Sequence, residues 1–399
     1  MLSRSQLLSY IPVTLAVGLA LGLTLLDAQI HPRSELFELN SLKALRTLNY
    51  QYQMNVEDLL IDKESESALI AELYKADALI PVQEKKDNKG LVVSLKEEEH
   101  LLLLQPQDPL SDEKLAEIAD QYARSIPEFA HVELDQEVSL ESPVYEWELN
   151  PMASQPVALS SEPLNEVVVA VIDSGVDEGH EIFADVSIQK GWNTLKDDET
   201  MVDDVGHGTH IAGIIAAHAP GVSLVPYKIV DSKGGKLSNV LEAFSKAMQD
   251  GVTVVNASFG LSTSSYALEN LIAKAYDQGI IVVSAAGNSG KDVGFYPASY
   301  AQSLAVGSVD AGGHQMPSSN YGNWVDVAAY GYRVKSSLPG NEYGYKSGTS
   351  QATAFVTAAV ARLLMQDPEL SFSEILEALE ASSAEQVKTG ELAGISIVE

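Results

Sequence analysis

The chain has 399 residues, of which 45% are hydrophobic and 20% charged, a composition that is typical of globular proteins and a length that favours two or more folded regions. Its formal net charge of −31 argues against nucleic acid and anionic lipid as partners, because both would be repelled. The sequence contains no cysteine, which excludes disulfides, four-cysteine zinc sites and thiol nucleophiles.

Residues 1–28 have the layout of an export segment. Arg4 is followed by an apolar run from about Leu7 to Leu26, the order of segments found in a secretory signal peptide. The run is close to the ~20 residues that span a bilayer, so an uncleaved membrane anchor is the alternative. In either case we expect the rest of the chain to be exported, secreted or held in the cell envelope, with membrane contact only if this segment stays uncleaved.

Two regions follow before any chemical motif. Residues 29–90 are acidic and helix-prone. Residues 91–139 have a different pattern: "GLVVSL" predicts a strand, and "SDEKLAEIADQYARSI" predicts a helix with Ser111 as its N-cap. The alternation in residues 129–138, "FAHVELDQEV", predicts a second strand. A strand–helix–strand unit of this size can fold as a small appended α+β domain.

Residues 153–399, which follow a linker at residues 140–152, show a regular alternation of buried strands and helices. The helical stretches between the strands each close with a glycine. Strands that are buried on both faces and alternate with helices predict a mainly parallel sheet in a three-layer α/β domain. Functional loops then belong at the carboxyl ends of the strands. The predicted strands are residues 167–173, 222–231, 252–260, 279–288 and 303–310.

Four polar positions interrupt this pattern. Asp173 ends the first of these strands, where an unpartnered carboxylate is costly. His207 begins a predicted helix, and Ser350 lies at the N-terminus of another predicted helix, where free N–H groups favour negative charge. Asn288 ends a strand among small residues, where its amide can donate to an oxyanion.

Each of these positions taken alone has a structural explanation: a strand-end cap, a turn serine or a packing histidine. Together they predict a catalytic triad, because the chain order Asp–His–Ser is the order found in subtilisin. A zinc site at His207 and His210 would need the HExxH spacing with its intervening glutamate, whereas Gly208 and Thr209 lie between these histidines. We therefore expect His210 to serve helix packing or hydrogen bonding, and we expect no metal ligand here.

Five motifs resemble those of the subtilisin-like serine proteases, peptidase family S8. "VAVIDSGV", "DDVGHGTHIAG" and "SGTSQATAFV" are similar to the Asp, His and Ser motifs, while "NASFG" and "AAGNSG" resemble the substrate-binding and oxyanion motifs. The region of residues 91–139 resembles the family's inhibitory prodomain. The resemblance implies these roles: Asp173 as orienting acid, His207 as general base, Ser350 as nucleophile, Asn288 as oxyanion donor, and Ser258, Phe259 and Gly260 as lining of the substrate cleft.

The chain also departs from the family pattern. Ala354 replaces a proline that usually follows the nucleophile, and Ile182 stands where a calcium-ligating aspartate is common. The stretch between "GIIAAH" and "APGVSLVPYK" is too short for the usual calcium loop, so no high-affinity calcium site is expected there; a weaker site elsewhere remains open, and catalysis needs no cofactor. Phe295 stands where relatives have a small residue at the floor of the specificity pocket, and Ser289 replaces a frequent acid, which predicts a shallow, uncharged pocket.

These observations predict an exported serine endopeptidase that is made as a zymogen and hydrolyses peptide bonds through an acyl-enzyme. Its expected partners are protein or peptide substrates and its own prodomain. The alternative is a catalytically inactive relative that binds polypeptides through its added-strand groove. A pure binding module would have no need of Asp173, His207, Ser350 and Asn288 together, which favours the enzyme.

Overall fold

The computed structural model describes residues 79–81, 90–95, 101–106, 110–125, 129–140, 165–383 and 385–398. The predicted signal or anchor at residues 1–28, most of the acidic region and the linker beyond Leu140 lie outside these residues. The chain divides into two compact units, between Asp135 and Gln136. None of the helices in the described ranges combines the length and apolar character that a bilayer span requires.

The described part of the N-terminal unit contains a four-stranded antiparallel sheet and one helix. The sheet order is β1 (Leu79–Pro81), β3 (Leu101–Pro106), β2 (Leu91–Leu95) and β4 (Phe129–Leu134), and the helix is α5 (Asp112–Ser125). Leu91, Leu104, Leu115 and Tyr122 are buried together between sheet and helix. The Ser111 hydroxyl accepts a hydrogen bond from the Lys114 backbone N–H at 3.3 Å, which confirms the predicted N-cap.

The C-terminal unit is built on a ten-stranded sheet whose hydrogen-bonded pairs are all parallel except β19–β20. Along the sheet the strands are β19 (Glu385–Gln386), β20 (Ser396–Val398), β16 (Val327–Tyr330), β15 (Ser303–Val309), β14 (Ile281–Ala285), β12 (Val254–Ala257), β6 (Val168–Asp173), β9 (Ser223–Lys228) and β7 (Ser187–Ile188), with β8 (Trp192–Asn193) also paired to β9. The five predicted strands of this region are all present in it.

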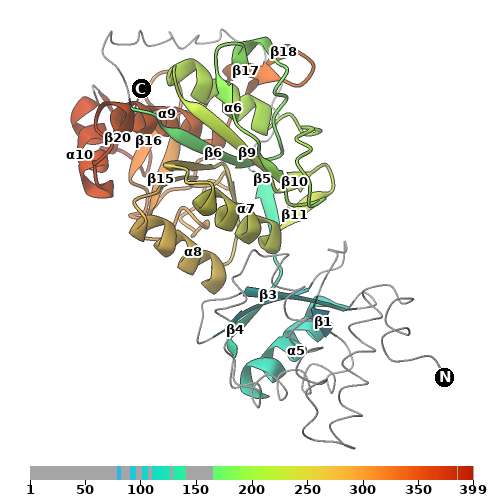
Figure 1. The fold of residues 1–399 in the computed structure, drawn as a ribbon. Coiled ribbons are helices and arrows are strands. Elements are labelled where there is room, and N and C mark those ends of the chain that lie inside the picture. Colours follow the sequence, from blue (N-terminus) through green and yellow to red (C-terminus); the bar gives the residue numbers. More distant parts are fainter. Residues whose placement is uncertain are drawn as a thin grey trace, which may run out of the picture. The chain divides into compact units, whose positions relative to one another are not determined.

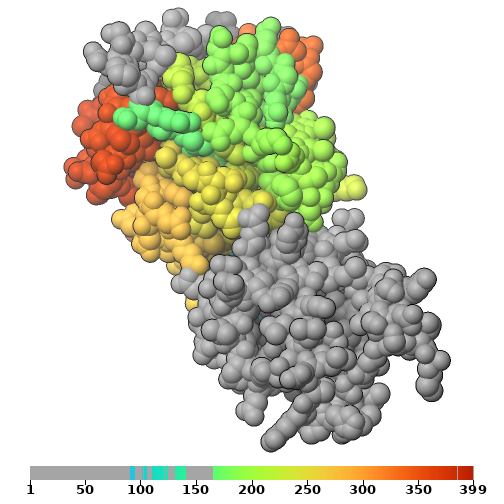
Figure 2. Space-filling view, in the orientation of Figure 1, coloured from blue at the N-terminus to red at the C-terminus, as the bar shows by residue number. Residues whose placement is uncertain are grey.

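Helices cover both faces of this sheet, which confirms the three-layer α/β prediction (Figure 1). On one face lie α6 (Gly208–His218) and α9 (Thr349–Gln366), which pack against each other, and α10 (Phe372–Ser382) packs against α9. On the other face lie α7 (Leu237–Gln249) and α8 (Tyr266–Asp277). The rings of Tyr276 in α8 and Phe372 in α10 meet edge-on, with their centroids 5.6 Å apart. In the space-filling view the red C-terminal segment borders the orange segment (Figure 2).

Two smaller strand groups complete the C-terminal unit. The first has the order β10 (Val230–Asp231), β11 (Gly234–Lys236), β5 (Glu137–Leu140) and β13 (Phe259–Gly260), and β5 is antiparallel to both neighbours. The second is the hairpin of β17 (Val334–Leu338) and β18 (Glu342–Lys346), which packs against α6. The stretch predicted as one strand at residues 129–138 is therefore two strands, because the Asp135 N–H bonds to the Gly90 carbonyl at 2.9 Å and the pairing with β2 ends there.

Candidate active site

Asp173 and His207 form a buried hydrogen-bonded pair. Asp173 ends β6 and is 0% exposed, and His207 immediately precedes α6. The His207 Nδ1 atom lies 2.7 Å from Asp173 Oδ1 and 2.9 Å from Oδ2, so the carboxylate holds the proton on Nδ1 and leaves Nε2 as the basic nitrogen. A Cβ atom at Gly208 would lie 2.1 Å from the Gly175 carbonyl oxygen, so only glycine lets the helix start approach the aspartate loop this closely.

Ser350 lies in the first turn of α9 and is joined to Ser258, which lies between β12 and β13. The Ser350 Oγ atom donates to the Ser258 carbonyl oxygen at 3.3 Å, and the Ser258 hydroxyl donates to the Ser350 carbonyl at 3.1 Å. The residue before the helix, Gly348, has a φ of 152°, which glycine adopts readily. Since α6 and α9 pack against each other, the elements that carry His207 and Ser350 are neighbours.

Asn288 is held against the start of the same helix. Its Oδ1 atom accepts a hydrogen bond from the Thr349 backbone N–H at 2.9 Å, while the Thr349 hydroxyl accepts from the Gly287 N–H at 3.1 Å. The carbonyl side of the amide is thus used for positioning. The amide nitrogen carries the donors, which is the chemistry that an oxyanion needs.

A buried polar network lies behind the Asp173–His207 pair, and sequence reasoning did not find it. The Ser174 N–H donates to Asp173 Oδ1 at 2.7 Å, and the Ser174 hydroxyl donates to Asp203 at 2.7 Å. The other Asp203 oxygen accepts from the N–H and the hydroxyl of Thr209 at 2.9 and 2.6 Å. Asp203 therefore ties the loop after β6 to the first turn of α6, which orients both members of the pair.

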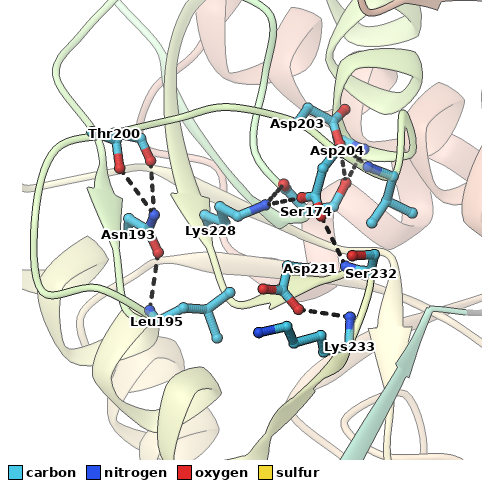
Figure 3. A network of polar contacts seen from close by, with 12 residues as sticks. Ser174, Asn193, Leu195, Thr200, Asp203, Asp204, Lys228, Asp231, Ser232 and Lys233 are labelled. Carbon is cyan, nitrogen blue, oxygen red and sulfur yellow. Dashed lines mark hydrogen bonds and ion pairs between the residues drawn. The ribbon is translucent and has the colours of Figure 1, made fainter.

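Figure 3 shows how Lys228 extends this network. The residue is 4% exposed. Its ammonium group donates to the Ser174 carbonyl at 2.6 Å and to Asp204 Oδ1 at 2.8 Å, and the Ser232 N–H donates to the other Asp204 oxygen at 3.0 Å. Burial raises the pKa of Asp204, but the hydrogen bonds from Lys228 and Ser232 outweigh it and hold that pKa well below its usual range. The available signals were a lysine inside an apolar strand and the paired acids before "VGHGT".

The cleft beside this site holds β5 as an inserted antiparallel strand. Leu140 lies opposite Phe259 and Ser139 opposite Gly260, while Val138 lies opposite Gly235 of β11. Val138 is 6% exposed, whereas its two neighbours in the strand are exposed, as alternation along a strand requires. Leu140 is the last paired residue of β5, and the residue before its partner Phe259 is Ser258, which is hydrogen-bonded to Ser350, so β5 runs with its carboxyl end toward Ser350.

The predicted cleft residues differ in what they contribute. The Phe259 ring is buried and meets Phe244 edge-on at 6.5 Å, so Phe259 offers its backbone, and not its ring, to the inserted strand. Phe295 is 6% exposed and lies against Gly260, where a Cβ atom would come within 2.1 Å of the Phe295 ring. The same ring lies 3.0 Å from a Cβ position built on Gly287.

His210 does not join the candidate triad. Its Nε2 atom lies 3.0 Å from the Val334 carbonyl oxygen, and the residue is fully buried in α6. Burial, with a smaller contribution from His207, lowers the pKa of His210 to about 3 and keeps the ring neutral. Within the described ranges, no group of three or more His, Asp or Glu side chains is placed to hold a metal ion.

The sequence profile of the subtilase family matches residues 165–394, which is more than half of the chain. The chain belongs to the subtilase family. Asp173, His207, Asn288 and Ser350 all fall inside the matched range of this subtilase. The N-terminal unit lies outside it.

Individual relatives agree with the family match. The subtilase is 38% identical to the thermophilic serine proteinase of Bacillus sp. (strain AK1) over 233 residues, which cover 56% of this chain and 57% of that protein. It is 36% identical to subtilisin E of Bacillus subtilis (strain 168) over 235 residues, or 55% of this chain and 61% of that protein. The match thus spans about three fifths of the length of these relatives.

Solved structures of subtilisin-like proteases share the fold. A cold adapted subtilisin-like serine proteinase superposes with a TM-score of 0.53 at 29% identity, over 61% of this chain and 93% of that one. A lanthipeptide protease superposes with a TM-score of 0.55 at 26% identity, over 58% of this chain and 86% of that one.

Proposed function

We propose that this subtilase is a serine endopeptidase in which Asp173, His207 and Ser350 form the catalytic triad. The observation that carries the proposal is the buried contact of 2.7 Å between His207 Nδ1 and the Asp173 carboxylate, in a site whose helix start carries Ser350. Family membership and the serine proteinases among its relatives support the same activity.

In the proposed mechanism, His207 Nε2 takes the proton of the Ser350 hydroxyl as its oxygen attacks the carbonyl carbon of a peptide bond. Asp173 keeps the imidazole in the required tautomer and stabilises the imidazolium that forms. The proton then passes from His207 to the leaving amine, which leaves an ester on Ser350. Water, deprotonated by His207, hydrolyses this ester and regenerates the hydroxyl.

The developing oxyanion of the tetrahedral intermediate needs donors that are already in place. The Asn288 amide and the backbone N–H of Ser350 are suited to this role, since Thr349 fixes Asn288 to the turn that carries the nucleophile. The positive end of the α9 dipole adds to the stabilisation.

We propose further that the enzyme is exported as a zymogen and that residues 91–139 form its inhibitory prodomain. β5 supports this proposal, because Glu137–Leu140 occupies the groove between β11 and β13 as an antiparallel strand. An added strand in a cleft is also how an extended peptide substrate binds. Export rests on the apolar run of residues 7–26.

The register of β5 leads to a specific processing site. Because the pairing of β5 with β13 ends with Leu140 opposite Phe259, next to Ser258, we propose that self-cleavage occurs at the Glu141–Ser142 bond, which lies just beyond the described residues. Glu141 is charged, whereas the Phe295 ring favours an uncharged residue at the position directly before the cleaved bond. A tethered segment has a high effective concentration, so the first cut does not require the preferred residue.

Intact mass and N-terminal sequencing of wild type and Ser350→Ala test the proposal. Wild type should yield a chain that begins at Ser142, and the Ala variant should keep the full exported length. Identical trimming of both proteins in a host that lacks other proteases would contradict self-processing. Equal hydrolysis of a peptide library by both would contradict the assignment of Ser350.

A further inference from the structure

Lys346 ends the strand that leads to the candidate nucleophile, four residues before Ser350. Its side chain is half-buried. Burial lowers the pKa of Lys346, and the charges of Asp173 and Asp203 partly offset this effect. In the described part of the chain no carboxylate lies within ion-pair distance of its ammonium. The two nearby carboxylates have other partners: Asp173 contacts His207, and Asp203 accepts from Ser174 and Thr209.

The hairpin register places this ammonium on the side of the active site. Lys346 lies directly opposite Val334, and paired residues of an antiparallel ribbon share a face. Val334 is buried in the core that includes α6, and its carbonyl contacts His210. Lys335 and Tyr345 form the next pair and therefore lie on the other face, where both are exposed.

The direction of β5 indicates which part of a substrate comes near Lys346. A strand in the groove of β11 and β13 runs toward Ser350, so those strands bind the residues before the cleaved bond. The residues after the bond continue beyond Ser350. The β17–β18 hairpin packs against α6, and in Figure 1 it lies apart from β5 and β11.

We propose that Lys346 is a specificity-determining residue that selects an acidic side chain at the first or second position after the cleaved bond. A half-buried ammonium without a carboxylate partner of its own is stabilised when a substrate carboxylate binds beside it. The chain as a whole is strongly acidic, with a net charge of −31, and repels acidic substrates. Lys346 therefore attracts a substrate carboxylate only locally. This inference rests on the proposed endopeptidase activity.

The test uses internally quenched peptides in pairs that differ only by Glu or Gln at the first or the second position after the bond. Mass spectrometry of the products verifies the cut. Wild type should show a kcat/KM ratio of Glu to Gln peptide of about fivefold at one of these positions. The ratio should fall to about one in Lys346→Gln and in 1 M NaCl, which screens the attraction.

Lys335→Gln is the matched control, because it removes the same charge from the opposite face of the same hairpin. It should keep the wild-type ratio. A wild-type ratio of one at both positions would overturn the inference, as would an equal collapse of the ratio in Lys335→Gln. If Lys346→Gln does not fold, the salt series on wild type decides: a ratio that 1 M NaCl leaves unchanged is contradictory. No hydrolysis of any peptide by wild type would instead reject the proposed function itself.

Discussion

The Lys228 ammonium lies 2.6 Å from the carbonyl oxygen of Ser174, the residue that follows Asp173. Its second partner is the Asp204 carboxylate at 2.8 Å, and the two side chains differ in exposure, at 5% for Lys228 and 38% for Asp204. The network thus joins a buried cation to an accessible anion, behind the loop that follows Asp173.

This asymmetry predicts unequal costs for removing the two partners. Lys228→Met leaves a solvated carboxylate and an unbonded Ser174 carbonyl, so we expect a loss of about 1–3 kcal/mol. Asp204→Ala leaves a buried ammonium without its anion, which costs about 3–5 kcal/mol. Urea unfolding in a Ser350→Ala background, which prevents self-digestion, measures both. If Lys228→Met were less stable than Asp204→Ala, this account of the network would be contradicted.

A second prediction concerns Asn288. Asn288→Asp keeps an oxygen that can accept from the Thr349 N–H but removes the amide donor, so kcat should fall by on the order of 10²–10³, the magnitude seen for such a donor in subtilisin. KM should change little, because the donor acts on the transition state. Steady-state hydrolysis of a peptide ester decides this, and a kcat within threefold of wild type would exclude Asn288 from the oxyanion site.

A third prediction concerns specificity before the cleaved bond. Because the Phe295 ring fills the space beside Gly260, wild type should prefer small or medium uncharged residues there. Phe295→Ala should raise kcat/KM for peptides with leucine or phenylalanine at this position by about tenfold, since a buried apolar side chain contributes ~1.5–3 kcal/mol. Phe259→Leu is the control, because that ring points toward Phe244. Library profiling that shows dominant cleavage after Arg or Lys in wild type would rule out the pocket as described.

A fourth prediction concerns acid stability. Burial and the neighbouring His207 and Lys346 lower the pKa of His210 to about 3, below the ~6.5 of an unfolded histidine. The unfolded state therefore binds more protons between these values, and stability is lost as pH falls through this window, by up to ~1.4 kcal/mol per pH unit.

His210→Asn, which keeps a donor for the Val334 carbonyl, should flatten this slope in urea unfolding between pH 7 and 5. His314→Asn is the control, because His314 is exposed and its Nδ1 atom lies 3.2 Å from the Asp310 carboxylate, so that this histidine lacks the burial that lowers the pKa of His210. The free energy of unfolding should depend less on pH in His210→Asn than in His314→Asn. An equal dependence in wild type and His210→Asn would reject the role of His210.

Much of the C-terminal unit could be predicted from the sequence, because local periodicity reports burial. The strands that end at Asp173 and near Asn288 are continuous apolar runs, and the family motifs place the candidate triad on strand ends and helix starts. The start of α7 at Leu237 depends on a side-chain contact, because the Asn239 side chain accepts a hydrogen bond from the Lys236 N–H at 3.1 Å and caps the helix there.

Long-range pairing could not be predicted. The sequence of β5 reads as a continuation of β4, and nothing local indicates that its partners are β11 and β13, about a hundred residues away. The same limit applies to Lys228, whose apolar neighbours predict a strand but not the carboxylate that it meets. The pattern also gave no separate signal for β1 and β3, which complete the N-terminal sheet.

The most direct test of the central claim is labelling with a fluorophosphonate, followed by peptide mapping. The reagent esterifies a serine only where a base activates the hydroxyl and donors stabilise the oxyanion. We expect one adduct, on the peptide that carries Ser350, and none in Ser350→Ala. An adduct of equal yield in the Ala variant, or an adduct that maps to another serine, would contradict the assignment of Ser350 as the nucleophile.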